Sequence, residues 1–87
     1  MYARVFERDA VKALKKLPAG GRANLRRRLE AIAANPHGRH GGFEPLAGDL
    51  AGLHQLRITR WRAVVALDHA GKTDRVTRLG HRREVYG

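Results

Sequence analysis

The hydrophobic period of this chain changes near its middle, from helical spacing to strand spacing, and this change most strongly limits the folds that it can adopt. Residues 10–17 and 25–33 each place apolar side chains three or four positions apart, as on one face of a helix. Asp9 stands where a capping residue of the first helix is expected, and Pro18 stands where that helix should end. We expect the second helix at about 22–34, after a turn at Gly20-Gly21 and before Asn35-Pro36.

The second half of the chain has the pattern of strands. Residues 53–58 have an alternating strand pattern with Leu56 and Ile58 as apolar members, residues 63–67 form a continuous apolar run, and residues 74–79 are expected to form another strand. A short run of this kind is typical of a central strand that is buried on both faces. A further strand is expected at 2–7, and residues 37–45 contain too much glycine and too many polar groups for regular structure.

The predicted order of elements is therefore β-α-α-β-β-β in one domain, residues 1–87. This is an α/β (more strictly α+β) fold, in which a twisted, mainly antiparallel sheet carries a two-helix hairpin packed on one face. The last three strands are joined by short turns and should pair as an antiparallel meander. The inward side of the first strand stays open, because Tyr2 and Phe6 share one side while Ala3 and Val5 share the other.

The charge of the chain predicts a negatively charged partner. Eighteen lysines and arginines stand against eight aspartates and glutamates, which gives a formal net charge of +10. Nucleic acid is the first candidate partner, because the release of counterions supplies much of the binding free energy. An acidic protein is the second, and a charge that serves solubility alone is the third interpretation.

Several classes of protein are excluded by what the sequence lacks. The absence of cysteine excludes a disulfide framework, cysteine-based zinc sites and thiol catalysis. The longest apolar run, residues 63–67, is far shorter than the roughly 20 residues that cross a bilayer. The N-terminal residues show no pattern of a signal peptide. We therefore expect a soluble, cytoplasmic protein without a membrane partner.

The glycine-rich segment 37–45 gives only a weak sign of a metal or phosphate site. His37 and His40 lie on it with Glu44 as the only acidic neighbour, which is a poor ligand set. Its glycines neither follow a predicted strand nor open a helix, as a phosphate-binding loop requires. The sequence therefore predicts no metal and no cofactor.

Three short patterns, in this order and at this length, resemble the RelE/ParE superfamily of bacterial toxins. The stretch LAGDLAGLHQLRITRWRAVVALD at 46–68 is followed by RLGHRREVY at 78–86, and the early helix hairpin with its Lys-Lys-Leu-Pro stop is similar as well. The patterns are Leu46-x-Gly48 with Gly52, Leu56-Arg57-x(4)-Arg62, and Gly80-His81-Arg82 with Tyr86.

The resemblance implies the toxin component of a type II toxin–antitoxin system. In the RelE branch, such a toxin is an endoribonuclease that cuts messenger RNA on the ribosome without a metal. The 2′-hydroxyl of the RNA attacks the adjacent phosphate, and a cognate acidic antitoxin neutralises the toxin. The ParE branch shares the fold but poisons DNA gyrase without cleaving RNA, and a gyrase-binding toxin is therefore the alternative.

Two arginines of the predicted hairpin are candidates for binding the scissile phosphate. Arg57 lies on the first strand of the meander and Arg62 begins the second, so that their side chains can share a face. The resemblance places Arg57 where a sheet-face lysine or arginine stands and Arg62 where the phosphate-binding arginine stands. The alternative is a pair of solvated strand arginines.

The C-terminal residues are the candidates for charge stabilisation and proton transfer. Arg82 and Tyr86 match the C-terminal arginine and tyrosine of the family. Arg82 can stabilise negative charge but cannot readily donate a proton, whereas Tyr86 can act as a base or stack on an unpaired nucleobase. His81 is of the residue type best suited to proton transfer near neutral pH, although a ring packed at a strand end is an equal alternative.

The neighbourhood of the hairpin supplies further candidates for RNA binding, namely His54, Arg60 and Trp61. Trp61 is either a turn anchor or a platform for base stacking. Gln55 and Arg57 stand where the best-known RelE pattern has paired lysines, and Gln55 cannot act as a base. Proton transfer then falls to His81 and Tyr86, or the activity is weak. Together, Arg57, Arg62, Arg82 and Tyr86 favour the RelE branch.

Overall fold

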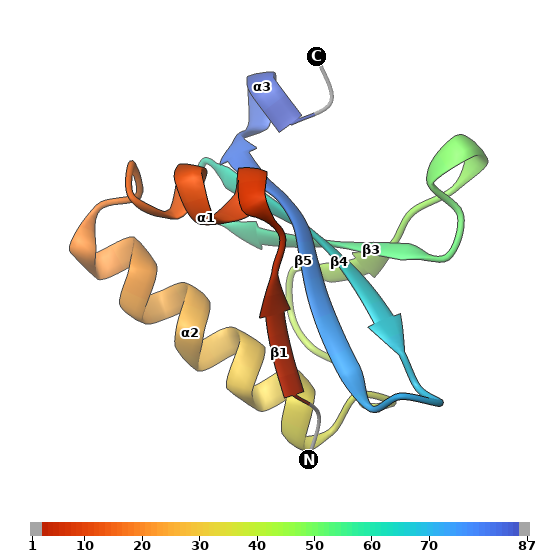
Figure 1. The fold of residues 1–87 in the computed structure, drawn as a ribbon. Helices are drawn as coiled ribbons and strands as arrows, with labels where there is room; N and C mark the ends of the chain where they lie inside the picture. The colour runs from red at the N-terminus through yellow and green to blue at the C-terminus, as the bar shows by residue number, and fades with distance from the viewer. Residues whose placement is uncertain (1–2, 86–87) are drawn as a thin grey trace.

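The computed structural model describes residues 3–85 of the chain. Its helices and strands, drawn in Figure 1, are β1 (Ala3–Phe6), α1 (Arg8–Leu14), α2 (Ala19–Ala34), β2 (Phe43–Pro45), the short 3-10 helix η1 (Gly48–Leu50), β3 (Leu53–Ile58), β4 (Trp61–Asp68), β5 (Thr73–His81) and α3 (Arg82–Val85). No helix in this range is long and apolar enough to cross a membrane.

The five strands form one sheet in the order β1-β5-β4-β3-β2. β3, β4 and β5 pair antiparallel, as the predicted meander requires, and β1 lies parallel to β5 at one edge. At the other edge β2 pairs antiparallel with β3. The prediction of an α+β fold with a mainly antiparallel sheet is therefore confirmed.

Both main helices pack on one face of this sheet, as predicted (Figure 1). One cluster of buried residues joins Ala10 of α1 and the α2 stripe to the side chains on one side of β3, β4 and β5. Its members are Ala10, Leu17, Leu25, Leu29, Ile32, Leu56, Ile58, Ala63, Val65, Val76 and Leu79. Phe6 packs against the same cluster, which settles the inward side of β1. Neither α1 nor α2 covers the opposite face of the sheet, which is called the outer face below.

The prediction that residues 63–67 are buried on both faces of the sheet is correct for the first three of them. Ala63, Val64 and Val65 are all buried, although Val64 lies on the outer face, whereas Ala66 and Leu67 are half-buried. The pairing of β4 with β5 is irregular next to Val64, where Thr77 is left over and its hydroxyl donates to the Val64 carbonyl at 3.2 Å. Such a bulge bends the strand and increases its twist.

The prediction that residues 37–45 are irregular throughout is wrong at their end, because Phe43–Pro45 form β2. Phe43 lies opposite Leu56 and packs against the core, and the Arg57 amide donates to the Gly42 carbonyl at 2.8 Å. Gly42 has φ +71°, a conformation that favours glycine and sets the entry into the strand. Pairing with β3 thus overrides a local sequence that gives little sign of a strand.

The helix boundaries also differ from prediction. α1 ends at Leu14, before Pro18, and its N-terminal residue Glu7 makes no side-chain cap, so that Asp9 lies in the first turn and does not cap the helix. α2 begins at Ala19, and its first turn includes the glycines expected in a preceding turn. A Cβ on Gly21 would stand 3.0 Å from Cγ of Leu17, so glycine there allows Leu17 to bury itself against the helix.

Candidate active site

Arg57 and Arg62 are direct partners across the β3–β4 hairpin. Their neighbours Leu56, Ile58 and Ala63 point into the core, so the two arginines point to the outer face. The next residue in this row is Gly80 of β5, which pairs with Arg62. Gly80 contributes no side chain to the outer face beside Arg62, although its backbone is buried. The sheet therefore presents two adjacent cations at an open surface.

The surrounding backbone orients the Arg62 guanidinium. Its Nη1 donates to the carbonyl of Thr59 at 3.0 Å and to that of Trp61 at 2.9 Å. The first carbonyl lies in the two-residue turn between β3 and β4, where Thr59 has φ +54°, and the second belongs to the first residue of β4. Nη1 of Arg62 is therefore engaged with the chain.

Arg57 is fixed mainly through its backbone. Its amide donates to Gly42, and its carbonyl accepts from Nη1 of Arg28 on α2 at 3.1 Å. Arg28 also donates from Nη2 to the Gly41 carbonyl. The Arg57 side chain is about half exposed, and its Nη2 lies 3.7 Å from Oε1 of Glu44. An exposed pair of this kind contributes at most about 1 kcal/mol, so an incoming phosphate can compete for Arg57.

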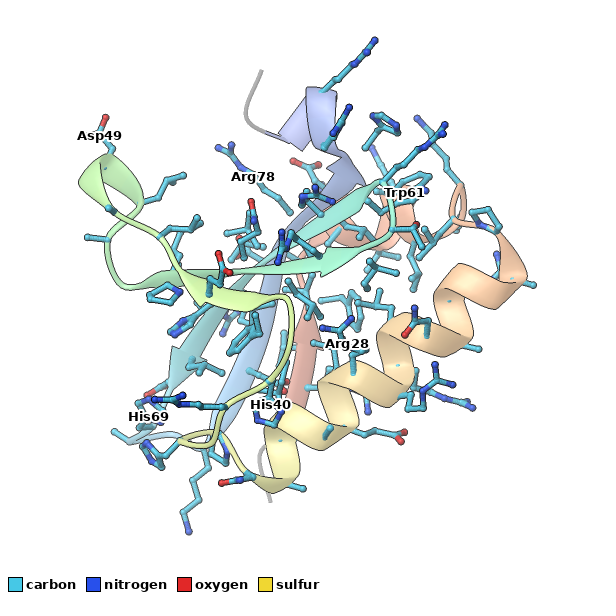
Figure 2. All side chains as sticks on the ribbon, turned by 180° about the vertical axis from the view of Figure 1, so that it is seen from behind. Arg28, His40, Asp49, Trp61, His69 and Arg78 are labelled. Carbon is cyan, nitrogen blue, oxygen red and sulfur yellow. The ribbon has the colours of Figure 1, made fainter. Side chains whose placement is uncertain are left out.

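The outer face holds two more arginines that were not among the predicted site residues. Arg78 pairs with Val64 and Arg75 pairs with Ala66, and both side chains are exposed. Strict alternation would put these two arginines on opposite faces, and only the bulge at Thr77 brings both to the outer face, so the sequence pattern gives no signal for the pair. Figure 2 shows Arg78 toward the same end of the sheet as Trp61.

A second group of basic residues lies where β5 passes into α3. Arg60, His81, Arg82 and Arg83 line a pocket of 360 Å³. The Arg82 amide donates to the Arg60 carbonyl at 2.9 Å, which holds the start of α3 against the hairpin turn. The Arg83 amide lies 3.5 Å from Nδ1 of His81, in the direction of a donated hydrogen bond. In that arrangement the proton of a neutral His81 ring resides on Nε2.

The remaining predicted residues lie on the helix-facing side of the sheet. His54 pairs with Val65 and Trp61 pairs with Ile58, so neither shares a face with Arg57 and Arg62. Trp61 packs against the core and lies opposite His81, so the register places His81 on this side of the sheet as well. These placements favour the anchoring alternative for Trp61, and the roles of His54 and Trp61 in RNA binding stay predictions. Tyr86 lies outside the described residues.

His54 belongs to an aromatic group at the other end of β3. Its ring stacks on Phe43 with centroids 4.7 Å apart and planes 11° apart. Burial lowers the pKa of His54, and the nearby His69 lowers it further, so this ring is neutral at neutral pH. Within residues 3–85, no group of three or more histidine, aspartate or glutamate side chains is disposed to hold a metal ion.

No protein-family model and no curated protein matches the sequence, whereas solved structures match nearly the whole chain. A chain of the RelBE2 toxin–antitoxin complex from Mycobacterium tuberculosis has 26% identity and a TM-score of 0.76, over 93% of this chain and 98% of that one. The YoeB/ParE toxin from Agrobacterium tumefaciens has 20% identity and a TM-score of 0.80, over 92% and 98% of the two chains. A chain of the YoeB–YefM complex from Staphylococcus aureus has 18% identity and a TM-score of 0.79, over 94% and 98%.

By its fold, this chain belongs to the RelE/ParE superfamily of toxins. The sequence resemblance is thereby confirmed at the level of the superfamily. The names of the similar structures include RelE, YoeB and ParE, so the likeness leaves the branch open. For this RelE/ParE chain, the activity has to be argued from the outer face of its own sheet.

Proposed function

We propose that this RelE/ParE chain is the toxin of a type II toxin–antitoxin system and acts as a ribosome-dependent mRNA endoribonuclease. The observation that supports this proposal is the direct pairing of Arg57 with Arg62 on the outer face of the sheet, close to the end of β5 from which Arg82 follows. Two guanidiniums at one site match the charge that an RNA phosphate gains during cleavage.

The proposed reaction needs only the RNA and the side chains of the chain. The 2′-oxygen forms a bond to the adjacent phosphorus, and the bond from phosphorus to the 5′-oxygen breaks. The products are a 2′,3′-cyclic phosphate and a 5′-hydroxyl. Arg57, Arg62 and Arg82 offset the negative charge of the phosphorane between these states.

Two protons must move in this reaction, one from the 2′-hydroxyl and one to the 5′-oxygen. Arginine cannot supply either transfer, because it stays protonated. His81 and Tyr86 are the candidates for these transfers. The acid would be the protonated ring of His81, which would have to reach the phosphate around the end of β5, because His81 pairs with Trp61. Tyr86 is the remaining candidate for the base. Gln55 lies between Arg57 and Leu53 on the outer face and has no titratable group.

We further propose a cognate acidic antitoxin as the partner. The similar structures from M. tuberculosis and S. aureus are complexes of a toxin with its antitoxin. A net charge of +10 and an uncovered basic face suit an acidic polypeptide, which opposite charge would steer toward this surface. Co-expression with a small acidic antitoxin gene beside this one should restore growth.

The test of the nuclease proposal is the Arg62→Ala variant, assayed for toxicity and for cleavage of ribosome-bound mRNA. Loss of one preorganised donor typically lowers the rate about 100- to 1000-fold, so toxicity should be relieved while the fold and antitoxin binding persist. Arg26→Ala is the matched control, because Arg26 is exposed on α2 and pairs only with Glu30 at 3.9 Å. This control should stay toxic.

Pulse labelling separates the nuclease from the gyrase-binding alternative. Incorporation of an amino acid should stop before incorporation of thymidine, cleavage should persist in EDTA, and the product should end in a cyclic phosphate. If Arg62→Ala and Arg82→Ala are both folded and fully toxic, or if DNA synthesis stops first, the nuclease proposal fails and gyrase binding replaces it.

A further inference from the structure

A second cluster of residues suited to RNA lies away from the arginine pair, at the end of the molecule marked by His40 and His69 in Figure 2. Here the loop after α2 meets the β2 edge and the turn between β4 and β5. The loop and the strands form a pocket of 360 Å³, within the range of ordinary ligand pockets. We call it the imidazole pocket; its lining residues are Pro36, His37, Gly38, Arg39, His40, Phe43, Pro45 and His54.

The rings at the imidazole pocket are arranged in flat stacks. Phe43 lies parallel to His54, and His37 stacks on His69 with centroids 4.4 Å apart and planes 21° apart. The ring of His40 stands edge-on to Phe43, at 6.2 Å and 78°. Stacked rings of this kind offer planar faces, and planar faces bind other planar rings.

The same geometry argues against a metal ion as the ligand. Nε2 of His40 lies 2.8 Å from the Asn35 carbonyl and is therefore engaged with the backbone. Stacking of His37 on His69 places ring faces, and not nitrogens, toward each other. The pocket histidines are therefore not arranged to coordinate a metal ion, in agreement with the absence of a cluster of metal-ligating side chains among residues 3–85.

The charge at the imidazole pocket suits a nucleotide. Arg39 lines it with an exposed side chain and supplies a cation for a phosphate. His54 is half-buried, and its Nδ1 is buried without a hydrogen-bond partner among the described residues. An aromatic wall next to one exposed cation is the combination with which proteins bind unpaired bases of single strands.

The position of the pocket relative to the proposed active site is also favourable. His54 and Arg57 lie three residues apart on β3, about 10 Å along the strand. Only the three residues of β2 lie beyond β3 at this edge of the sheet. A flexible strand that crosses the outer face at Arg57 can therefore turn around this edge and reach the pocket.

We propose that the imidazole pocket binds an unpaired nucleobase of single-stranded RNA, with Arg39 holding the phosphate of that nucleoside. The proposal rests on the proposed function, because it takes RNA as the substrate. It adds a base-binding subsite that lies outside the residues of the cleavage reaction.

The test is the affinity of the whole chain for a 2′-O-methyl RNA hexanucleotide, which lacks the attacking hydroxyl and cannot be cleaved. His37→Ala and Arg39→Ala should each weaken binding at least about five-fold, since removal of a stacking ring or a phosphate contact has effects of this order. Arg27→Ala is the control, because Arg27 is exposed on α2 and bonds only to Asn24 at 3.3 Å in the described structure. It should bind as the wild type does.

Two further measurements identify what the pocket recognises. His37→Phe should retain the affinity, because phenylalanine preserves a stacking face, and AMP should shift the ring resonances of His37 and His54 in the wild type. Wild-type affinity in both alanine variants, equal loss in His37→Phe and His37→Ala, or loss of binding in EDTA would overturn the proposal. These readouts do not involve cleavage, so they are independent of the Arg62→Ala toxicity test.

Discussion

Replacement of Asp74 by asparagine should stabilise the fold at neutral pH. Asp74 lies on β5, pairs with Arg4 of β1 and has no exposed surface. Neither oxygen of its carboxylate forms a hydrogen bond to another described residue. Burial raises the pKa of Asp74, and the positive charge of Arg4 and the backbone amide of Asp74 itself oppose this rise only in part. The ionised side chain therefore destabilises the folded state.

The size of the effect follows from two opposing contributions. A buried polar group without a partner costs about 1–3 kcal/mol, and a charged one costs more. Attraction to the positive charge of Arg4 offsets part of this cost. Arg4 is shared, because its Nη2 also lies 3.7 Å from Oε1 of Glu30. We expect Asp74→Asn to raise the free energy of unfolding by about 1–2 kcal/mol at pH 7.

The sign of the pH dependence distinguishes this explanation from a simple change in packing. Above the raised pKa, the wild type carries the full cost of the buried charge, whereas asparagine does not. As the pH falls through the raised pKa toward the ordinary value of 3.8, the folded wild type takes up a proton first. The advantage of Asp74→Asn should therefore be largest at pH 7 and vanish below about pH 3.8.

Urea unfolding, followed by the fluorescence of the single tryptophan, measures this difference at each pH. Asp49→Asn is the control, because Asp49 is exposed in the loop before β3 and should change the stability by less than about 0.5 kcal/mol. A less stable Asp74→Asn protein at pH 7 would refute the reasoning, since it would mean that the ionised carboxylate is well paired.

Two further substitutions test the supports of the hairpin. Arg28→Met removes the guanidinium that donates to the carbonyls of Gly41 and Arg57. This change should lower the free energy of unfolding, measured by urea titration, by about 1–2 kcal/mol. Unchanged stability would show that these hydrogen bonds contribute nothing. Thr59→Asn should raise the free energy of unfolding by about 0.5–1 kcal/mol and with it the melting temperature, because asparagine tolerates φ +54° better than a β-branched residue. A lower melting temperature would contradict this.

The elements that the sequence predicted well are those whose pattern is local. The alternation in residues 53–58 predicted both the burial of Leu56 and Ile58 and the exposure of Arg57. A short turn then made Arg62 its neighbour, as the register shows. β2 was missed because its three residues include a proline and follow two glycines, and its stability comes from pairing with β3.

The parts of the candidate site that escaped prediction depend on contacts between distant residues. The sequence around Arg28 gives no sign of its role, because Arg28 is one of several consecutive arginines on α2. Its hydrogen bond to the Arg57 carbonyl on β3 depends on the tertiary fold. His69 meets His37 only because the β4–β5 turn reaches the loop after α2. The faces of His54 and Trp61 follow from strand alternation, but their assignment to RNA binding rested on proximity in sequence to Arg57.

One feature of the fold, the register of β3 against β4, sets both the stability and the charge of the outer face. In this register Leu56 lies opposite Ala63 in the core, and Arg57 lies opposite Arg62 on the surface. A shift of β3 by one residue against β4 would turn Arg57 toward α2 and expose Leu56 and Ile58. Like charges placed side by side oppose the pairing by themselves. The apolar core, the two-residue turn and the bonds from Arg28 must therefore hold the two cations together, and a bound phosphate would relieve their repulsion.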